Sequence, residues 1–283
     1  MEKKAWPYVA GLLDAEGTIY VAVDKRPNGI IGISLQIIIT NTDLRIMKWL
    51  VSNFGGKFYR KKNQRGYSTI NSPDIYFWYV FGKANQEAFL LGILTHLRAK
   101  KQECVLALEF VRMSGWNKER KLQIAAEVKA VKIGDVLKDR QENLVRLSLK
   151  EEAAFAAGLF DGDGSIGSTV EVTQKRLILI RWLLMCFGGR FQERRMNGDK
   201  TYYRWYLSGK KNKEQFLLRL IPYLLLKKRA AIDLLETLRL RSIESSATTD
   251  MLGIFEPSKM KTQSELTGDS KSEPVKTQDS INK

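Results

Sequence analysis

Residues 9–17 read VAGLLDAEG and residues 156–164 read AAGLFDGDG, so one short stretch occurs twice in the chain. Each copy starts with small and apolar residues and ends in two carboxylates and a glycine, which predicts an apolar helix that stops at the glycine. Gly11 and Gly158 would let two such helices pack closely, because side chains at the contact set the interaxial distance. The two acidic ends would then lie side by side.

Two further pairs of landmarks recur in the same order along the chain. They are FGGKF at 54–58 with FGGRF at 187–191, and GKANQEAFLLGIL at 82–94 with GKKNKEQFLLRLI at 209–221. The spacing between partners falls from 147 residues at the opening stretches to 133 and then 127, so length differences are confined to connections. Such a series indicates duplication of one structural unit.

Each unit is expected to run helix, two strands, helix, two strands, helix, which makes the chain an α+β protein. Residues 18–41 alternate around a Pro-Asn-Gly turn and predict a hairpin, and residues 42–56 predict a helix with a glycine stop. The expected divisions are a first unit at 1–113, a charged and mostly helical linker at 114–150, a second unit at 151–244 and a disordered tail at 245–283.

The composition indicates a polyanionic partner. The 283 residues contain 47 Lys and Arg against 31 Asp and Glu, a formal charge of +16, which favours nucleic acid first and an anionic membrane surface second. The run at 216–226 is too short and too interrupted to span a membrane. The N-terminus has no export signal, so we expect a protein inside the cell, in the cytoplasm of a microbe or phage host or in an organelle.

Histidine and cysteine content narrows the chemistry. His96 is the single histidine, which excludes nuclease and hydrolase designs that need several. Cys104 and Cys186 are expected to be reduced core thiols. Hydrolysis in this chain would therefore depend on carboxylates, lysines and a metal ion.

The repeated acidic ends are electrostatically unusual. A helix C-terminus carries partial negative charge, so each carboxylate there costs roughly 0.3 to 1 kcal/mol. An ordinary buried helix end with a glycine cap is the plainer interpretation. The same placement in both copies instead suggests a compensating cation, and oxygen ligands of this kind suit magnesium.

The motif pair resembles the LAGLIDADG homing endonucleases, in the form that carries both motifs on one chain, and the similarity extends over residues 4–242. The resemblance implies two αββαββα units with the motif helices packed at a pseudo-twofold interface. It also implies antiparallel sheets that form a saddle over double-stranded DNA, in a monomer with internal symmetry. Members of the family cleave long, nearly palindromic sites and leave staggered ends.

The resemblance assigns metal ligands to the eighth motif position, which is Glu16 in the first unit and Asp163 in the second. The backbone carbonyls of Ala15 and Gly162 are implied as further metal contacts, with Mg²⁺ as the ion and Mn²⁺ as a substitute. Glu16 departs from the usual aspartate, which puts the geometry of the metal in question more than the activity. The sixth motif positions, implied to be structural, are Asp14 and Asp161.

The family also places a basic and a polar residue near each scissile phosphate. The matching lysines are Lys100 and Lys227, and the matching polar residues are Asn41 and Gln174. A plainer interpretation stays open for all four, since helical lysines are normally solvated and a polar residue after a strand is normally a helix cap.

DNA contacts are expected from the strand faces, because Arg, Gln and Asn can read base edges while Lys mostly holds phosphates. Taken singly, each candidate is equally well a solvated side chain. The candidates are Tyr20, Lys25, Arg26, Gln36, Arg60, Lys61, Lys62, Gln64, Arg65 and Trp78 in the first unit, and Arg190, Gln192, Arg194, Arg195, Arg204 and Tyr206 in the second.

The two units differ directly after the motif. Residues 18–41 number 24, whereas the corresponding residues 165–174 number ten. Part of the second DNA-reading surface should therefore be reduced, and we expect a recognition footprint weighted toward the first unit.

Three functions remain open from the sequence. A metal-dependent, site-specific DNA endonuclease leads, because both acidic positions are present. A group I intron maturase would use the same scaffold on intron RNA without needing the acidic pair. A DNA-binding protein that lost catalysis would normally have replaced one or both acids.

Overall fold

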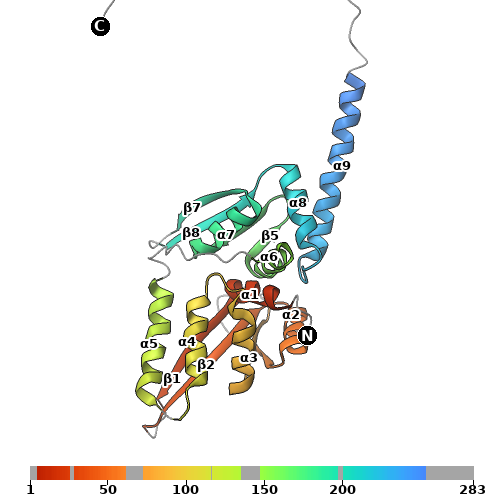
Figure 1. The fold of residues 1–283 in the computed structure, drawn as a ribbon. Coiled ribbons are helices and arrows are strands. Elements are labelled where there is room, and N and C mark those ends of the chain that lie inside the picture. Colours follow the sequence, from red (N-terminus) through yellow and green to blue (C-terminus); the bar gives the residue numbers. More distant parts are fainter. Residues whose placement is uncertain are drawn as a thin grey trace, which may run out of the picture. The chain divides into compact units, whose positions relative to one another are not determined.

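The computed structural model describes residues 5–25, 29–61, 73–115, 117–134, 147–196 and 200–252. The chain divides into a large compact unit, 1–241, and a separate unit, 242–283. The large unit holds both copies of the repeated motif (Figure 1).

Both repeats follow the expected element order. The first repeat contains α1 (Ala5–Glu16), β1 (Gly17–Lys25), β2 (Ile31–Asn41), α2 (Leu44–Phe54), β3 (Lys57–Lys61), β4 (Ile75–Tyr79), α3 (Lys83–Leu94) and α4 (Lys101–Arg112). Helix α5 (Lys118–Gly134) follows in the predicted linker. The second repeat contains α6 (Leu149–Asp163), β5 (Gly164–Ile166), β6 (Val170–Gln174), α7 (Leu177–Phe187), β7 (Arg190–Met196), β8 (Lys200–Leu207), α8 (Lys210–Leu220) and α9 (Lys228–Leu252). The predicted α+β class and the duplicated order are confirmed.

Local sequence explains where several helices begin and end. Asp43 caps α2 by accepting the backbone N–H of Arg45, and Gly55 ends the helix with a positive φ of 69°. Ser148 and Glu151 form a reciprocal capping box at the start of α6, which satisfies two N–H groups that a helix start leaves unpaired. The motif helix of the second repeat therefore has a strongly defined start.

The two sheets share one topology, in the orders β1-β2-β4-β3 and β5-β6-β8-β7, and every strand pair is antiparallel. Strands β5 and β6 have 3 and 5 residues, whereas β1 and β2 have 9 and 11. The shortened first hairpin predicted for the second repeat is thus present.

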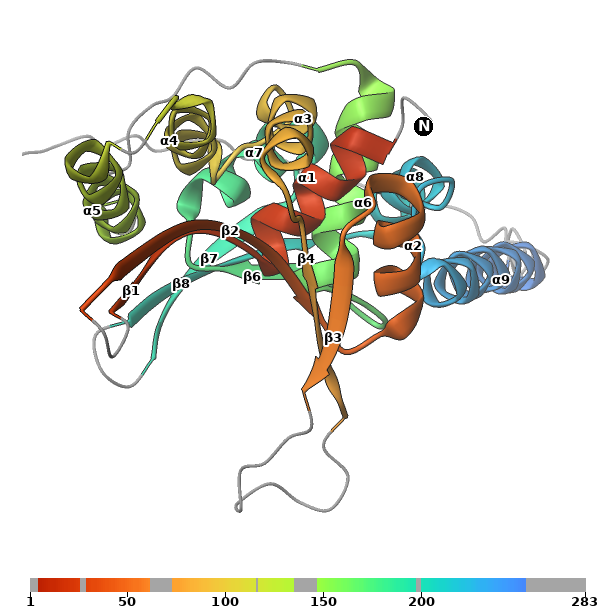
Figure 2. The same ribbon diagram turned by 90° about the horizontal axis from the view of Figure 1, so that it is seen from below.

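One face of each sheet is covered by helices. In the first sheet α1, α3 and α4 lie on the same side of the strands, as Figure 2 shows. Alternate residues such as Ile19, Ile37 and Ile39 point to that side and are fully buried. The alternate positions between them, including Tyr20 and Gln36, lie on the opposite face.

Trp78 belongs to the core, so its prediction as a DNA contact is wrong. It is fully buried on the helix-covered face, and its indole N–H donates to the carbonyl of Gly55. Trp205 is its counterpart in the second repeat and donates in the same way to Gly188. Trp78 pairs with the buried Ile39 and therefore points to the helix-covered side of the sheet. In a short strand with several aromatic residues, the sequence alone does not define which residues face which side.

Helices α1 and α6 pack directly against one another between the two repeats (Figure 1). A Cβ atom on Gly11 would lie 2.0 Å from the carbonyl oxygen of Phe155, and one on Gly158 would lie 2.0 Å from that of Tyr8. Both distances are far below any tolerated contact. The glycines therefore permit the close backbone approach that the sequence predicted.

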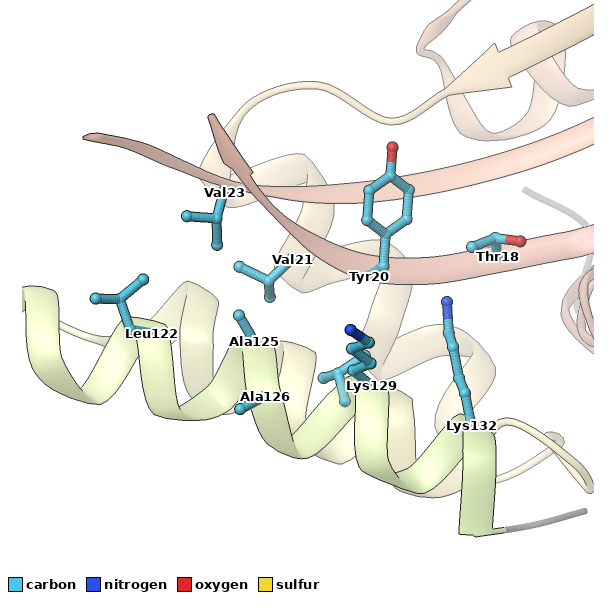
Figure 3. A pocket seen from close by; sticks show the side chains of 10 residues that line it. Thr18, Tyr20, Val21, Val23, Leu122, Ala125, Ala126, Lys129 and Lys132 are labelled. Carbon is cyan, nitrogen blue, oxygen red and sulfur yellow. The ribbon is translucent and has the colours of Figure 1, made fainter. Parts of the chain in front are cut away.

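Helix α5 packs beside the edge strand β1 and leaves a cavity of about 550 Å³ between them, shown in Figure 3. Apolar side chains of both elements form most of its wall. The ammonium group of Lys132 lies 5.4 Å from the centre of the Tyr20 ring, a cation–π contact. Neither Glu16 nor Asp163 lines this cavity.

The remaining expectations concern termini, thiols and membranes. Helix α9 continues to Leu252, past residue 245 where we expected a tail to begin, and residues 253–283 lie outside the described part. Cys104 and Cys186 are both free, and burial raises their thiol pKa values to about 12 and about 11. Among the described helices, none is both long and apolar enough to cross a bilayer.

Candidate active site

The first motif aspartate caps another helix. The buried carboxylate of Asp14 accepts the backbone N–H groups of Arg98, Ala99 and Lys100 at 2.8, 2.9 and 2.9 Å. These groups lie directly before α4, whose N-cap is Lys100, at the positive end of the helix dipole. The end of α1 is thereby joined to the segment before α4. Burial raises the pKa of Asp14, and Lys100 and the backbone N–H groups oppose that shift.

The second motif aspartate does the same at α9. Asp161 accepts the backbone N–H groups of Leu225, Leu226 and Lys227 at 2.7, 3.1 and 2.9 Å. It also accepts a hydrogen bond of 2.7 Å from the hydroxyl of Tyr8, which belongs to the other repeat. Asp14 and Asp161 thus have equivalent positions, with one additional donor at Asp161.

Each predicted lysine lies against the carbonyl end of the motif helix in its own repeat. The ammonium of Lys100 donates to the carbonyls of Leu13 and Asp14 at 2.8 and 2.6 Å. The ammonium of Lys227 donates to the carbonyl of Phe160 and lies 3.2 Å from that of Asp161. A positive charge at a helix C-terminus stabilises the dipole, so these lysines supply part of the compensation that the sequence attributed to a metal.

Burial weakens the charged form of both lysines. It lowers the pKa of Lys100 to about 8, and the charge of Asp14 opposes that shift. It also lowers the pKa of Lys227, against the attraction of Asp161 and Asp163. Lys100 is therefore buried and Lys227 half-buried at the interface, unlike solvated surface lysines.

The predicted metal ligands end the two packed helices. A Cβ atom on Gly162 would lie 2.5 Å from the Cβ of Ala15 and 3.1 Å from the Cγ of Glu16, so α1 and α6 remain in contact down to their acidic ends. Burial, followed by repulsion from Asp163, raises the pKa of Glu16. Burial likewise raises the pKa of Asp163. The two carboxylates share one partly dry region.

The lysines act on this carboxylate pair as well. The charges of Lys227 and Lys100 lower the pKa of Glu16 and that of Asp163, but less than burial raises them. Two acids and two bases are thus close enough to influence one another's ionisation. Such clusters of perturbed groups are typical of functional sites.

The two predicted polar residues behave differently. The side-chain amide of Gln174 donates to Asp163. The side-chain oxygen of Asn41 instead accepts the backbone N–H of Asp43 at 2.9 Å, in the turn before α2. Asn41 thus stabilises the turn before α2, whose cap is Asp43, whereas Gln174 lies at the acidic pair.

A divalent cation fits this region only in part. The carboxylates and the carbonyls of Ala15 and Gly162 are the oxygen donors that magnesium prefers. The described residues contain no cluster of three or more His, Cys, Asp or Glu that could hold an ion alone. The ammonium of Lys227 lies 3.3 Å from the carbonyl oxygen of Gly162, so the lysine and a metal ion would share this oxygen. The residues present suit an ion whose other ligands come from water and substrate oxygens.

The open faces of both sheets carry about half of the predicted DNA contacts. Strand alternation groups them with one another and away from the buried tryptophans. The residues on the open faces are Tyr20, Gln36, Lys61, Arg190, Gln192, Arg194, Arg204 and Tyr206. Arg204 forms an ion pair with Glu171 on the same face.

Other predicted contacts lie elsewhere. By alternation Lys25, Arg60 and Arg195 fall on the helix side of their strands, at or near strand ends, and Arg60 pairs with Asp74 at 2.5 Å. Because the strand period is two, a run of consecutive basic residues cannot share one face. The candidates that lie outside the described residues are Arg26, Lys62, Gln64 and Arg65.

Sequence reasoning missed a set of charged groups buried between the repeats. Arg98 pairs with Glu152 at 3.1 Å, and Glu152 also accepts the indole N–H of Trp182 at 2.7 Å. Arg176 pairs with the fully buried Glu103 at 2.6 Å. These charges are not shared between the two copies, so the repeat did not indicate the pairs.

Comparison with known proteins gives one sequence match. Residues 9–76 match the model of the LAGLIDADG endonuclease family. This segment is similar to the LAGLIDADG endonucleases. The match covers most of α1, the first hairpin, α2, β3 and the first two residues of β4. Comparison with curated protein sequences gave no match.

Solved structures extend the LAGLIDADG likeness over both repeats. The I-SmaMI LAGLIDADG homing endonuclease bound to cleaved DNA matches with a TM-score of 0.64 at 16% identity, over 90% of this chain and 94% of that one. I-SmaMI bound to uncleaved DNA with calcium ions matches with a TM-score of 0.62 at 16% identity, over 90% and 96%. I-LtrWI bound to target DNA matches with a TM-score of 0.64 at 16% identity, over 89% and 95%.

At these identities the structural matches show the fold, and the sequence match shows similarity to the family over residues 9–76. The chain is therefore similar to single-chain LAGLIDADG homing endonucleases across both repeats. The resemblance that the two motifs carried is confirmed.

Proposed function

We propose that the chain is a site-specific endonuclease that hydrolyses one phosphodiester in each strand of a long, nearly palindromic DNA site. The observation that carries the proposal is the meeting of Glu16 and Asp163 at the ends of two packed helices, where burial and mutual repulsion raise the pKa of Glu16. Such an arrangement is unfavourable for folding alone. The arrangement becomes favourable when a cation binds between the carboxylates and a DNA phosphate, because the cation offsets the repulsion.

Each group of the site has a proposed role. Glu16 and Asp163, with the carbonyls of Ala15 and Gly162, would hold Mg²⁺ or Mn²⁺ together with DNA oxygens. When bound, the ion would activate water and stabilise charge on the leaving oxygen. Gln174 orients the carboxylate of Asp163 through its amide.

The lysines have an electrostatic role in this proposal. Lys100 and Lys227 each lie beside one motif helix end, so each would stabilise the negative charge that develops at one scissile phosphate. Their position, buried for Lys100 and half-buried for Lys227, strengthens this effect because the local dielectric is lower than in water. One lysine would serve each strand.

The double-stranded DNA partner is supported by charge and by the open faces. The chain carries a formal charge of +16, and basic or amide side chains occupy the uncovered faces of both sheets. DNA-bound I-SmaMI and I-LtrWI have the same fold. Their DNA-bound structures support double-stranded DNA as the partner of this chain as well.

A cleavage assay tests the proposal. The substrate is the DNA flanking the coding locus, joined without the insertion, in the presence of magnesium. The wild-type protein should cut both strands, and Glu16→Gln and Asp163→Asn should each lower the rate by about 100-fold or more while DNA binding persists. DNA cleavage that persists in both variants would contradict a mechanism that depends on Glu16 and Asp163. RNA splicing assistance without any cutting would favour the maturase alternative.

A further inference from the structure

Two contacts that cross between the repeats occur at the starts of α4 and α9. Arg176, the residue before α7, donates to the carbonyl of Ala99 and pairs with Glu103 at 2.6 Å. Tyr8 in α1 donates to Asp161 at 2.7 Å. The first contact reaches the segment that carries Lys100. The second reaches the carboxylate that holds Lys227.

Each contact occurs once in the molecule, because the symmetry-related position of the other repeat has a different residue. Tyr8 corresponds to Phe155, which has no hydroxyl, in the spacing of 147 residues that relates Asp14 to Asp161. Glu103 corresponds to Ala230 in the spacing of 127 residues that relates the two lysines. Neither contact can therefore be repeated at the symmetry-related position.

The contact of Arg176 reaches Lys100 through the backbone. Ala99 directly precedes Lys100, and the N–H groups of both residues bind Asp14. Arg176 holds the carbonyl of Ala99, so this peptide is fixed from both repeats. Glu103 is fully buried and lies in the first turn of α4, where its pairing anchors Arg176. The direction of the Lys100 side chain depends on this short segment.

The contact of Tyr8 reaches Lys227 through a carboxylate. Asp161 accepts the N–H of Lys227 at 2.9 Å, and the hydroxyl of Tyr8 donates to the same side chain. Loss of that hydroxyl would leave Asp161 with its backbone donors only. The Asp161 carboxylate could then rotate, and the start of α9 with it.

We propose that Arg176 with Glu103 forms a positioning pair for Lys100, and that Tyr8 is a positioning residue for Lys227. Cleavage of the two strands can then be impaired separately, by changes that touch neither the acidic pair nor a lysine. This inference rests on the proposed function, in which each lysine serves one strand.

Strand-specific, single-turnover cleavage of a duplex labelled on each strand tests the inference. Lys100→Ala and Lys227→Ala first identify which strand each lysine serves. The positioning pair is removed in the double variant Arg176→Ala with Glu103→Ala, so that neither member of the ion pair is left without the other. It should slow the Lys100 strand by about 10- to 100-fold and change the other strand by less than about twofold. Tyr8→Phe should slow the opposite strand.

Matched controls separate positioning from general damage. The double variant Arg112→Ala with Glu87→Ala removes an exposed ion pair from the other end of α4, and it should leave the strand ratio unchanged. In a Lys100→Ala background, loss of Arg176 and Glu103 should add less than about twofold, because residues that act through one another are not additive. DNA affinity measured with calcium should stay at the wild-type value.

The outcomes are distinct for the two hypotheses. A wild-type protein that cuts neither strand would overturn the proposed function itself. If the wild-type protein cuts both strands, equal slowing of the two strands, or full additivity with Lys100→Ala, would overturn the inference. Tyr8→Phe removes one oxygen atom and reproduces Phe155 of the other repeat, so it tests the inference even if the Arg176 variant does not fold.

Discussion

The carbonyl oxygen of Tyr8 lies 2.0 Å from the position that a Cβ atom would take on Gly158. The symmetry-related pair, Gly11 and Phe155, has the same separation. The two motif helices are thus in backbone contact, and this contact brings Glu16 to Asp163.

Replacing Gly158 with alanine should destabilise the protein by about 2 kcal/mol or more, because the methyl group would meet backbone that cannot move aside. Gly167→Ala is the matched control, since nothing lies within 4 Å of a Cβ atom there, and its effect should stay within about 0.5 kcal/mol. Denaturant unfolding measures both. Equal stabilities of the two variants would contradict the close packing of α1 and α6.

Glu16→Gln should stabilise the metal-free protein at pH 7. The raised pKa of Glu16 means that the native state binds the proton more tightly than the unfolded state, so stability falls as pH rises through the interval between the two pKa values. Glutamine keeps the size and cannot ionise. After allowance for solvent screening, we expect a gain on the order of 1 kcal/mol, seen as a melting temperature a few degrees higher.

With magnesium bound, the wild-type protein should melt at a higher temperature than Glu16→Gln. An ion that binds the native state alone raises the melting temperature of the wild-type protein and should act much less on Glu16→Gln. Glu236→Gln, an exposed position on α9, is the control and should respond to magnesium as the wild-type protein does. A Glu16→Gln variant that melts below the wild type in chelator would contradict the role of charge repulsion.

The rate of cleavage at the Lys100 strand should fall as pH rises through about 8. Burial lowers the pKa of Lys100 to about 8, so the ammonium group that stabilises the transition state is lost above that pH, about tenfold per unit. The measurement is the ratio of strand-specific rates between about pH 7 and 9.5, an interval that spans this ionisation. A rate that rises across this range relative to the other strand would point to a neutral lysine acting as a base.

The same lysine affects stability with a defined sign. Because the folded pKa lies below the unfolded value of 10.5, the unfolded state binds more protons between about pH 8 and 10.5, and stability should rise with pH there. Lys100→Met, of similar length and without charge, should lack this contribution. Thermal unfolding of both proteins across that range gives the comparison.

Base recognition should be stronger in the half-site that the first repeat contacts. Strands β1 and β2 offer 9 and 11 residues to a groove, whereas β5 and β6 offer 3 and 5. Cleavage of substrates substituted one base pair at a time measures the dependence. Equally strong dependence in both half-sites would show that β7 and β8 compensate for the short hairpin.

Much of the fold could be predicted because the chain repeats itself. Two copies of one pattern indicated the element order, the α1–α6 interface and the shortened hairpin, since spacing, small residues and strand alternation are local properties. Glu16, Asp163, Lys100 and Lys227 were assigned from the family resemblance, and the repeat supported the two lysines because they align with one another. The structure brings these four close enough to shift one another's pKa values.

Face assignment was less predictable from sequence. Trp78 and Arg60 were grouped with Gln36 by composition, yet strand register puts them on the other side of the sheet. Register depends on which strands pair and where, and a shift of one residue reverses every side chain.

The sequence by itself determined the duplicated units, the close helix contact and the acidic residues at its end, because these follow from residue types at fixed local spacings. Only the tertiary structure decided how the charges are distributed. It assigned Asp14 and Asp161 to backbone N–H groups, turned Gln174 but not Asn41 toward the acidic pair, and placed Arg176 against the Lys100 segment. Most of these partners lie far apart in the chain, so the packing of the helices and the two repeats is what brings them together.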